Sequence, residues 1–527
     1  MKKIGNLPRA IEHARLLREK YLADDTRPGW HFAVPGDYGL PGDPNGAFFA
    51  DGRYHLMYLY DCRSDSFRWG HISSADLLHW RAHPDAVVPD RLDGGIFSGG
   101  AFVDGDGVCY LSYWGLPVPG GGHGGIRLIR SCDRRYDRWE KFGDYALACT
   151  EPGILCLDGG GRRRWLGCAD PSNIWRKGGF YYMQTGNLCV LTKFRRDGLH
   201  DYGAQAPARD ADPDISGDWV DLFRSSDLKQ WEYLHRFYQR DASGVWTGAD
   251  EDAMCPSFLP LPKSPAGGEA SGRYLQLFIS HNRGCQYYIG SYDTDKDLFL
   301  PLRHGRMTWT DNTFFAPEAL VDGAGRQIMW SWLLDNPSDE KQRGWSGVYG
   351  LPRSLWLRED GSLGIAPAEE IKNLRCRRED FLAAVPADGR AALDCANGVS
   401  CEIILRADVT GGAQAGLYIR AAPDFSEYTK IWYDAANARL VFDAAKSGRL
   451  GRPVTETAPL ELAPGERLEL DVFIDNSVVE VFANGRQAIT RRVYPEGAES
   501  TGVHVFTAGC PRVEELAVYE MAPANFY

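Results

Sequence analysis

The chain has 527 residues, a length that fits two or three domains. Hydrophobic residues make up 44% and charged residues 25%, which is ordinary for a folded globular protein and excludes a disordered chain. The 59 basic and 71 acidic residues leave a net charge of −12. Because an acidic surface repels phosphate backbones, we expect no nucleic-acid partner.

The first 25 residues begin with a basic stretch, but Arg, Glu and Lys interrupt every turn that follows. This pattern predicts no signal peptide, and no run of 18 apolar residues predicts a membrane span. The 13 cysteines are odd in number, scattered and without a Cys-x-x-Cys pair, which argues against a disulfide framework and a zinc site. We expect a cytoplasmic protein with reduced thiols that needs no metal or other cofactor and has no membrane partner.

Residues 8–24 carry Ile11, Ala14, Leu17 and Tyr21 near helical spacing, which predicts one amphipathic helix within an N-terminal segment, 1–28. From 29 to 365 the pattern of apolar and polar residues changes to short apolar or alternating runs, which are separated by Gly, Asp, Asn and Pro. Many short strands with turn signals between them favour a sandwich, a barrel or a propeller.

A weak internal repeat favours the propeller. The sequence Ser-Ala-Asp-Leu-Leu-His-Trp at 74–80 is echoed at 226–231 and more loosely at 131–139, each time after a strand-like run. Propeller blades produce such echoes because each blade repeats one supersecondary unit.

The second half of the chain begins after a charged connector. Residues 366–385 are expected to be a linker, and alternating strands with an Asn-Gly hairpin signal at 484–485 follow it. Residues 386–527 contain no dense cluster of potential catalytic groups, and we expect a β-sandwich there.

Three acidic segments stand out in the first domain: 42–46, 168–173 and 250–256. The first two contain Asp-Pro, which alone indicates a plain turn, and the third has three adjacent acids before a strand-like run. In a propeller the inner strands of different blades converge, so carboxylates far apart in sequence can meet. Glycoside hydrolysis requires two such carboxyl groups, and the 16 tryptophans fit either stacking on sugar rings or a β-rich core.

The ordered motifs at 43–46, 69–80, 97–99, 169–171 and 255–256 resemble glycoside hydrolase family 32, the invertase, inulinase and levanase-like β-fructofuranosidases. The resemblance spans roughly residues 29–520 and continues through 312–318, 326–332, 470–475, 478–482 and 492–495. It implies a five-bladed β-propeller followed by a β-sandwich, an all-β fold with a short N-terminal helix.

The resemblance also implies retaining hydrolysis or transfer of fructofuranosyl units from sucrose, fructo-oligosaccharides or fructans. By this likeness Asp43 is the nucleophile and Asp170 the transition-state stabiliser. The acid/base carboxyl falls in the segment that ends at 255–256. There we favour Glu251, because its longer side chain can reach across a loop, with Asp252 as the alternative.

Three positions depart from the family pattern. Met254 stands where the family has Glu, Ala169 where it has Arg, and Leu59 where it has Gln. The loss of a bidentate Arg and of a polar amide affects the choice of substrate more than the class of reaction.

The expected substrate-binding residues are Asn45, Trp69, Phe97, Ser98 and His281, although a buried blade Trp and a structural His fit Trp69 and His281 equally well. Two other functions stay open at this point. One is a propeller hydrolase acting on arabinofuranosides, and the other is a non-catalytic fructan-binding protein. The partner is a small-molecule or oligosaccharide substrate, and the oligomeric state is left open, a homodimer being one option.

Overall fold

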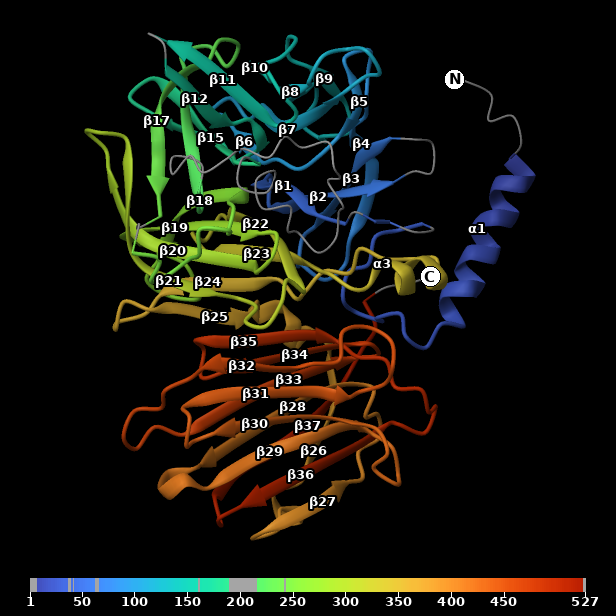
Figure 1. Ribbon diagram of the computed structural model, residues 1–527. Coiled ribbons are helices and arrows are strands. Elements are labelled where there is room, and N and C mark those ends of the chain that lie inside the picture. Colours follow the sequence, from blue (N-terminus) through green and yellow to red (C-terminus); the bar gives the residue numbers. More distant parts are fainter. Residues whose placement is uncertain are drawn as a thin grey trace.

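The computed structural model describes residues 7–36, 39–40, 42–61, 66–159, 162–188, 216–240 and 243–524. A body of five β-sheet blades lies above a two-sheet sandwich, and helix α1 (Leu7–Leu22) lies beside them (Figure 1). This confirms the predicted five-bladed propeller, sandwich and short N-terminal helix. No helix in these ranges is long and apolar enough to cross a membrane.

Each blade is built on antiparallel strands that follow one another in sequence. Blade one contains β1 (Pro44–Ala50), β2 (Arg53–Asp61), β3 (Phe67–Ser74) and β4 (Arg81–Val87). Blade two contains β5 (Asp93–Ile96), β6 (Ala101–Val103), β7 (Cys109–Pro117), β8 (Gly125–Ser131), β9 (Trp139–Lys141) and β10 (Leu147–Ala148). The separate hairpin of β11 (Ile154–Gly159) and β12 (Arg162–Gly167) precedes blade three.

Blade three contains β13 (Ala169–Pro171), β14 (Trp175–Lys177), β15 (Phe180–Gly186), β16 (Trp219–Ser225) and β17 (Glu232–Gln239). Blade four contains β18 (Met254–Pro262), β19 (Ala270–Ser280), β20 (Gly284–Asp293) and β21 (Leu298–Arg306). Blade five contains β22 (Phe314–Val321), β23 (Gln327–Leu333), β24 (Arg353–Leu357) and β25 (Leu363–Pro367), with helix α3 (Pro337–Arg343) between β23 and β24. All of β23 is buried, because neighbouring blades cover both faces of the sheet.

One turn recurs in blades one to four, between β3 and β4, β8 and β9, β16 and β17, and β20 and β21. In each blade an Asp side chain accepts backbone N–H groups of the turn: Asp76, Asp133, Asp227 and Asp293. A residue with positive φ follows it: Leu77, Tyr136, Leu228 and Asp297. The first three copies explain the weak repeat in the sequence. The fourth has no Trp at its end, so the sequence pattern did not reveal it.

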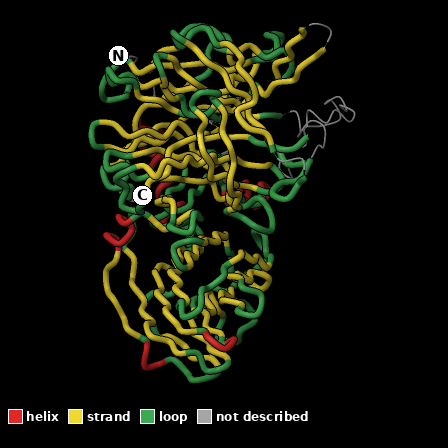
Figure 2. The backbone as a smooth tube through the Cα atoms, turned by 90° about the vertical axis from the view of Figure 1, so that its left-hand side faces the viewer, coloured by secondary structure: helices red, strands yellow, loops and turns green. Residues whose placement is uncertain are grey.

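The sandwich consists of two six-stranded sheets. One contains β26 (Arg375–Asp380), β28 (Ser400–Asp408), β33 (Leu468–Asp475), β34 (Val478–Ala483), β35 (Gln487–Arg492) and β37 (Arg512–Met521). The other contains β27 (Gly389–Leu393), β29 (Gln414–Ala421), β30 (Tyr428–Asp434), β31 (Arg439–Lys446), β32 (Thr455–Pro459) and β36 (Gly502–Ala508). The short helices η3 (Leu382–Ala384) and η4 (Thr410–Gly412) lie in loops, and strands fill both bodies in the turned view of Figure 2.

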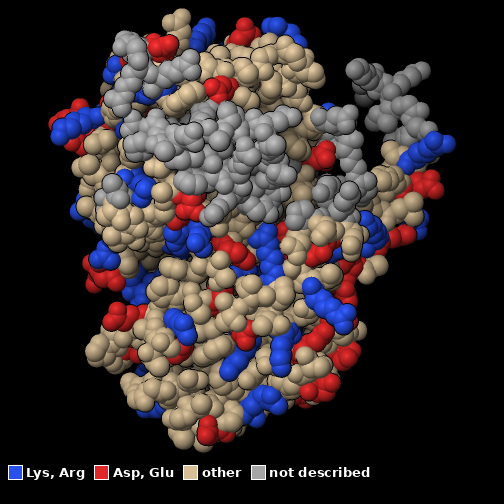
Figure 3. Space-filling view, viewed as in Figure 1, with Lys and Arg blue, Asp and Glu red and all other residues tan. Residues whose placement is uncertain are grey.

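The segment 366–385, expected to be a linker, contains regular structure. It forms the 3-10 helix η2 (Glu369–Leu374) and then β26, which pairs with β37 at the edge of a sandwich sheet. Arg375 in β26 binds the Glu402 carboxylate of β28 through two hydrogen bonds of 2.6 Å. The charged residues of β26 are therefore those of an edge strand, where charged side chains discourage pairing with other chains. Acidic and basic side chains are interspersed over the face in Figure 3.

A buried ion-pair network joins the propeller to the sandwich. His31 lies between two carboxylates of the sandwich, with Nδ1 2.9 Å from Asp475 and Nε2 3.1 Å from Glu480. Arg353 of blade five donates to the other oxygen of Glu480 at 2.8 Å. Burial lowers the pKa of His31, but the hydrogen bonds and charges of the two carboxylates outweigh burial and raise it. Burial raises the pKa of Glu480, yet His31 and Arg353 bring it down to about 2.

We expect Glu480→Gln to destabilise the protein by about 3 kcal/mol at pH 6, because it leaves buried positive charge unpaired. The Glu480 contribution exists above its unfolded pKa and disappears as pH falls toward 2, so the difference from wild type should shrink in acid. Urea unfolding midpoints measured between pH 3 and 8 check this. Glu19→Gln, in an exposed pair with Arg15, is the control and should change little. Equal shifts for both variants would contradict the expectation.

Candidate active site

The inner strands of the blades form a ring with a pocket at one end. β1 contacts β6 and β22, and β18 contacts β13 and β22. Side chains contributed by all five blades line the pocket: Asp43, Phe97, Trp114, Asp170, Leu188, Met254, Cys255, Ile279, His281, Phe315 and Trp332. The pocket is where the propeller fold predicts that distant segments meet.

A β-bulge recurs on the inner strands of blades three, four and five. The pairing register shifts at 169–171 in β13, at 254–257 in β18 and at 315–318 in β22. Each bulge contains a non-glycine residue with positive φ directly before a proline: Asp170 at 35°, Cys255 at 47° and Ala316 at 47°. Bulges redirect side chains, and strained backbone clusters at functional sites. β1 has a similar irregularity between Asn45 and Phe48.

Asp43 is held from two sides. Its backbone carbonyl accepts the Leu59 N–H and the Asn45 side-chain amide, both at 2.9 Å, and the Ser98 hydroxyl donates to its Oδ2 at 2.6 Å. Asn45 also accepts the Gly99 N–H at 3.1 Å, so both ends of its amide bind protein. The structure thus makes Asn45 and Ser98 supports of Asp43. The sequence analysis predicted that both residues bind substrate, but neither of them lines the pocket.

Asp170 has a strongly perturbed carboxyl group. Burial and the charge of Asp43 raise its pKa to about 7, while the Cys255 thiol and the charge of His281 act in the opposite direction. The thiol donates to Oδ2 at 3.4 Å, and Oδ1 has no hydrogen-bond partner among the described residues. A buried acceptor of this kind suits the hydroxyl of a bound sugar.

Asp252 and His281 form a pair at the end of blade four. One carboxylate oxygen of Asp252 accepts the His281 backbone N–H at 2.8 Å, and the other lies 2.5 Å from the ring Nδ1. The His281 ring packs edge-on against Phe315 with 5.7 Å between ring centres. Asp252 itself does not line the pocket, but it fixes a side chain that does.

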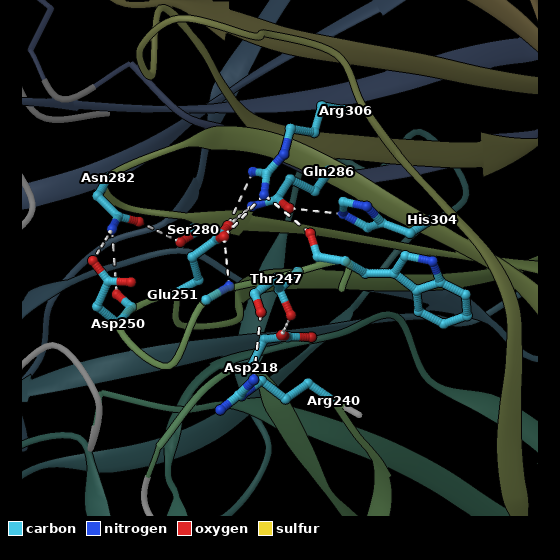
Figure 4. Close-up of polar contacts among 12 residues, drawn as sticks. Asp218, Arg240, Thr247, Asp250, Glu251, Ser280, Asn282, Gln286, His304 and Arg306 are labelled. Carbon is cyan, nitrogen blue, oxygen red and sulfur yellow. Dashed lines mark hydrogen bonds and ion pairs between the residues drawn. The ribbon is translucent and has the colours of Figure 1, made fainter. Parts of the chain in front are cut away.

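Glu251 is not placed with these groups, contrary to the sequence-based preference. Arg306 binds both of its oxygens, at 2.9 and 3.0 Å, and Gln286 donates to Oε2 at 2.7 Å (Figure 4). Burial raises the pKa of Glu251, but Arg306 and the other donors outweigh burial and lower it. A carboxylate kept ionised in this way is a poor proton donor. The reach argument considered side-chain length alone and missed partners contributed by β20 and β21.

Trp69 also differs from its expected role in substrate binding. Its side chain is fully buried between blades one and two, and Nε1 donates to the Phe97 carbonyl at 3.0 Å. Phe97 lines the pocket as predicted and stacks on Trp114, 5.3 Å between ring centres. Trp114 and Trp332 are pocket residues that the sequence reasoning missed, because strand tryptophans alone do not distinguish pocket from core.

Comparisons with known proteins agree with this geometry. The profile of the Glycosyl hydrolases family 32 N-terminal domain matches residues 31–141 and 212–367, and that of the family 32 C terminal matches 370–520. The chain belongs to glycosyl hydrolase family 32. This confirms the resemblance seen in the motifs. The unmatched stretch 142–211 includes Asp170, which the structure places beside Asp43 in the pocket.

Relatives in this family match along most of the chain. Raffinose invertase of Escherichia coli is 29% identical over 91% of this chain and 92% of its own length. Levanase of Bacillus subtilis is 26% identical over 95% of this chain and 71% of its own. The crystal structure of fructan 1-exohydrolase IIa from Cichorium intybus has the same fold, with a TM-score of 0.78, 23% identity and coverage of 95% and 98% of the two chains.

The three positions that depart from the family pattern are all buried and apolar. Met254 is 2% exposed and lines the pocket, and Ala169 and Leu59 are fully buried. Met254 has no proton to donate and therefore cannot act as an acid in this pocket.

A histidine cluster in blade one was also missed, because its members lie on three different strands. Nitrogen atoms of His55, His71 and His83 lie within 4.8 Å of one another. The His71 and His83 rings are stacked, with 4.2 Å between centres and 21° between planes. His55 Nδ1 and His71 Nε2 lie 2.9 Å apart, and both ring nitrogens of His83 contact other side chains, those of Ser73 and Asp137. Hydrogen bonds between protein groups thus account for the cluster, and the expectation of a metal-independent reaction stays a prediction.

We expect Asp170→Asn to stabilise the protein at alkaline pH. The folded pKa of Asp170 lies above its unfolded value, so wild type loses stability as pH rises from about 4 through 7. The variant lacks this loss and should be about 2–4 kcal/mol more stable at pH 8, with little difference near pH 4. Urea midpoints across this range measure it. Asp295→Asn, at an exposed turn of blade four, is the control. If the stability difference between the variant and wild type does not vary with pH, folding does not raise the pKa of Asp170 and the expectation is wrong.

Proposed function

We propose that this protein releases fructofuranosyl units from sucrose, fructo-oligosaccharides or fructans by double displacement with retention at the anomeric carbon. The observation that carries the proposal is that Asp43 and Asp170, from blades one and three, share one buried pocket with aromatic walls. A retaining glycosidase needs a carboxylate nucleophile at the anomeric carbon, and a second carboxylate nearby can stabilise the positive charge of the transition state. The choice of a fructofuranosyl substrate is supported by the relatives in this family, which include an invertase and a levanase.

In this proposal Asp43 attacks the anomeric carbon and forms a covalent fructosyl ester. The Ser98 hydroxyl fixes one of its oxygens, and the two hydrogen bonds to its backbone carbonyl hold the main chain. Such positioning reduces the entropy lost on reaching the transition state. Asp170 accepts ring hydroxyls and, when ionised, stabilises the positive charge that develops on the ring.

Aromatic side chains enclose the rest of the pocket. Phe97 and Trp114 come from blade two, and Phe315 and Trp332 from blade five. Flat apolar surfaces of this kind pack against the C–H faces of a sugar ring, while the carboxylates meet its hydroxyls.

We expect Asp43→Asn to lower kcat for fructose release by about three orders of magnitude or more, because an amide is a poor nucleophile. The unfolding midpoint and the affinity for sucrose, measured by calorimetry, should stay close to wild type. Asp51→Asn, in the exposed turn between β1 and β2, is the matched control and should keep full activity. Retention of more than a few per cent of activity in Asp43→Asn would remove Asp43 from this role.

A substrate panel separates the proposal from its alternatives. Fructose released from sucrose, raffinose, 1-kestose, inulin, levan or difructose anhydrides supports the proposal. Arabinose released from arabinofuranosides alone identifies the runner-up enzyme, and binding of fructans without release identifies a non-catalytic binding protein.

The proposal places the reaction in the cytoplasm. It is supported by the cysteines of the described residues, which are all free thiols. Fractionation of the source cells tests the location, and recovery outside the cell would contradict it.

A further inference from the structure

The pocket contains a nucleophile, but the source of the proton for the leaving group is not evident from the sequence. We infer that His281, oriented by Asp252, is the acid that protonates the leaving oxygen and the base that later activates water. This inference rests on the proposed function and assigns one further catalytic residue and one positioning residue to it.

Few groups of the pocket can supply a proton. Among the side chains described there, and apart from the nucleophile Asp43, only Asp170, Cys255 and His281 carry an exchangeable proton on an acid of suitable strength or close to it. Burial, together with the charges of Asp170 and Asp43, raises the pKa of the Cys255 thiol well above its ordinary value. The thiol therefore keeps its proton at neutral pH, which leaves Asp170 and His281.

The surroundings of Asp252 favour His281. This buried carboxylate, 2% exposed, contacts the Ser280 hydroxyl, the His281 N–H and the His281 ring Nδ1. With Nδ1 held by a carboxylate, proton exchange with a ligand falls to Nε2 on the same ring. Asn312 donates to the His281 carbonyl at 2.7 Å and fixes the backbone as well. Contacts at the ring Nδ1, the backbone N–H and the carbonyl thus fix both the side chain and the main chain of His281.

Carboxyl groups lie close to the His281 ring. Asp252 contacts the ring, Asp170 interacts with it electrostatically, and Asp43 lines the same pocket. Arg452 binds Asn312 behind the His281 backbone at 2.6 Å. Asp170, by contrast, shares the pocket with the Asp43 charge and has an acceptor oxygen without a hydrogen-bond partner, which suits a hydroxyl-binding role.

The two steps balance without another reactant. In the first, the proton on His281 Nε2 moves to the glycosidic oxygen as its bond to the anomeric carbon breaks, Asp43 bonds to that carbon, and the alcohol leaves. In the second, neutral His281 takes a proton from water, the water oxygen attacks the anomeric carbon, and the Asp43 carboxylate is released with fructose. His281 ends protonated, as it began.

The test compares substrates whose leaving groups differ in basicity. His281→Gln should lower kcat/KM for sucrose by about 10²–10⁴-fold, and that for p-nitrophenyl β-fructofuranoside by less than about tenfold, because nitrophenolate leaves without a proton. Asp252→Asn should show the same preference with a smaller loss, and should move the basic limb of its pH–rate profile to lower pH. This second variant keeps the inference testable if His281→Gln does not fold.

His304→Gln is the matched control, since this histidine of blade four contacts Gln286 and lies outside the pocket. It should leave the ratio of the two substrates unchanged. Equal losses on both substrates in His281→Gln and Asp252→Asn would mean a structural role and overturn the inference. So would the leaving-group preference appearing in Asp170→Asn instead. If wild type releases no fructose from either substrate, the proposed function fails first, and the inference fails with it.

Discussion

Two carboxylates buried in one pocket repel each other, and most of the surrounding structure follows from that repulsion. Asp43 and Asp170 come from different blades and line the same pocket. Neutral donors from Ser98 and Asn45 hold Asp43 in place. Asp170 responds with a pKa near 7. An arrangement of this kind persists only on a rigid frame, which five blades closed into a ring provide.

The fold was largely readable from the sequence because its signals are local. The strand-like runs, the Asp-Pro turns and the repeated Asp turns can each be recognised within a few residues. The order of these motifs along the chain resembles that of the family. The 366–385 segment was predicted to be a linker because a dense run of charged residues is typical both of a linker and of an exposed edge strand. Only the long-range pairing of β26 with β37 separates the two.

Some residues of the site could also be predicted from the sequence, whereas others depend on contacts between distant parts of the chain. Asp43 and Asp170 both precede a proline, which alone indicates only a turn, so their roles were predicted from the ordered family motifs. Adjacent acids such as Glu251 and Asp252 carry no comparable local signal. Their directions depend on Arg306 and His281, which lie 55 and 29 residues further along the chain. Similarly, Trp69 and Trp114 look alike in sequence, and only blade packing sends one to the core and the other to the pocket.

The bulged inner strands and the aromatic side chains make the wall of the pocket uneven. Blades three and four turn a carboxyl group and a thiol toward it at their left-handed residues, whereas blade five places Ala316 at the same position. Aromatic rings come from blades two and five. Polar and apolar groups therefore face the pocket from different sides. A five-membered sugar also presents hydroxyls on some sides and C–H groups on others, so the order of the blades limits how its ring can lie in the pocket.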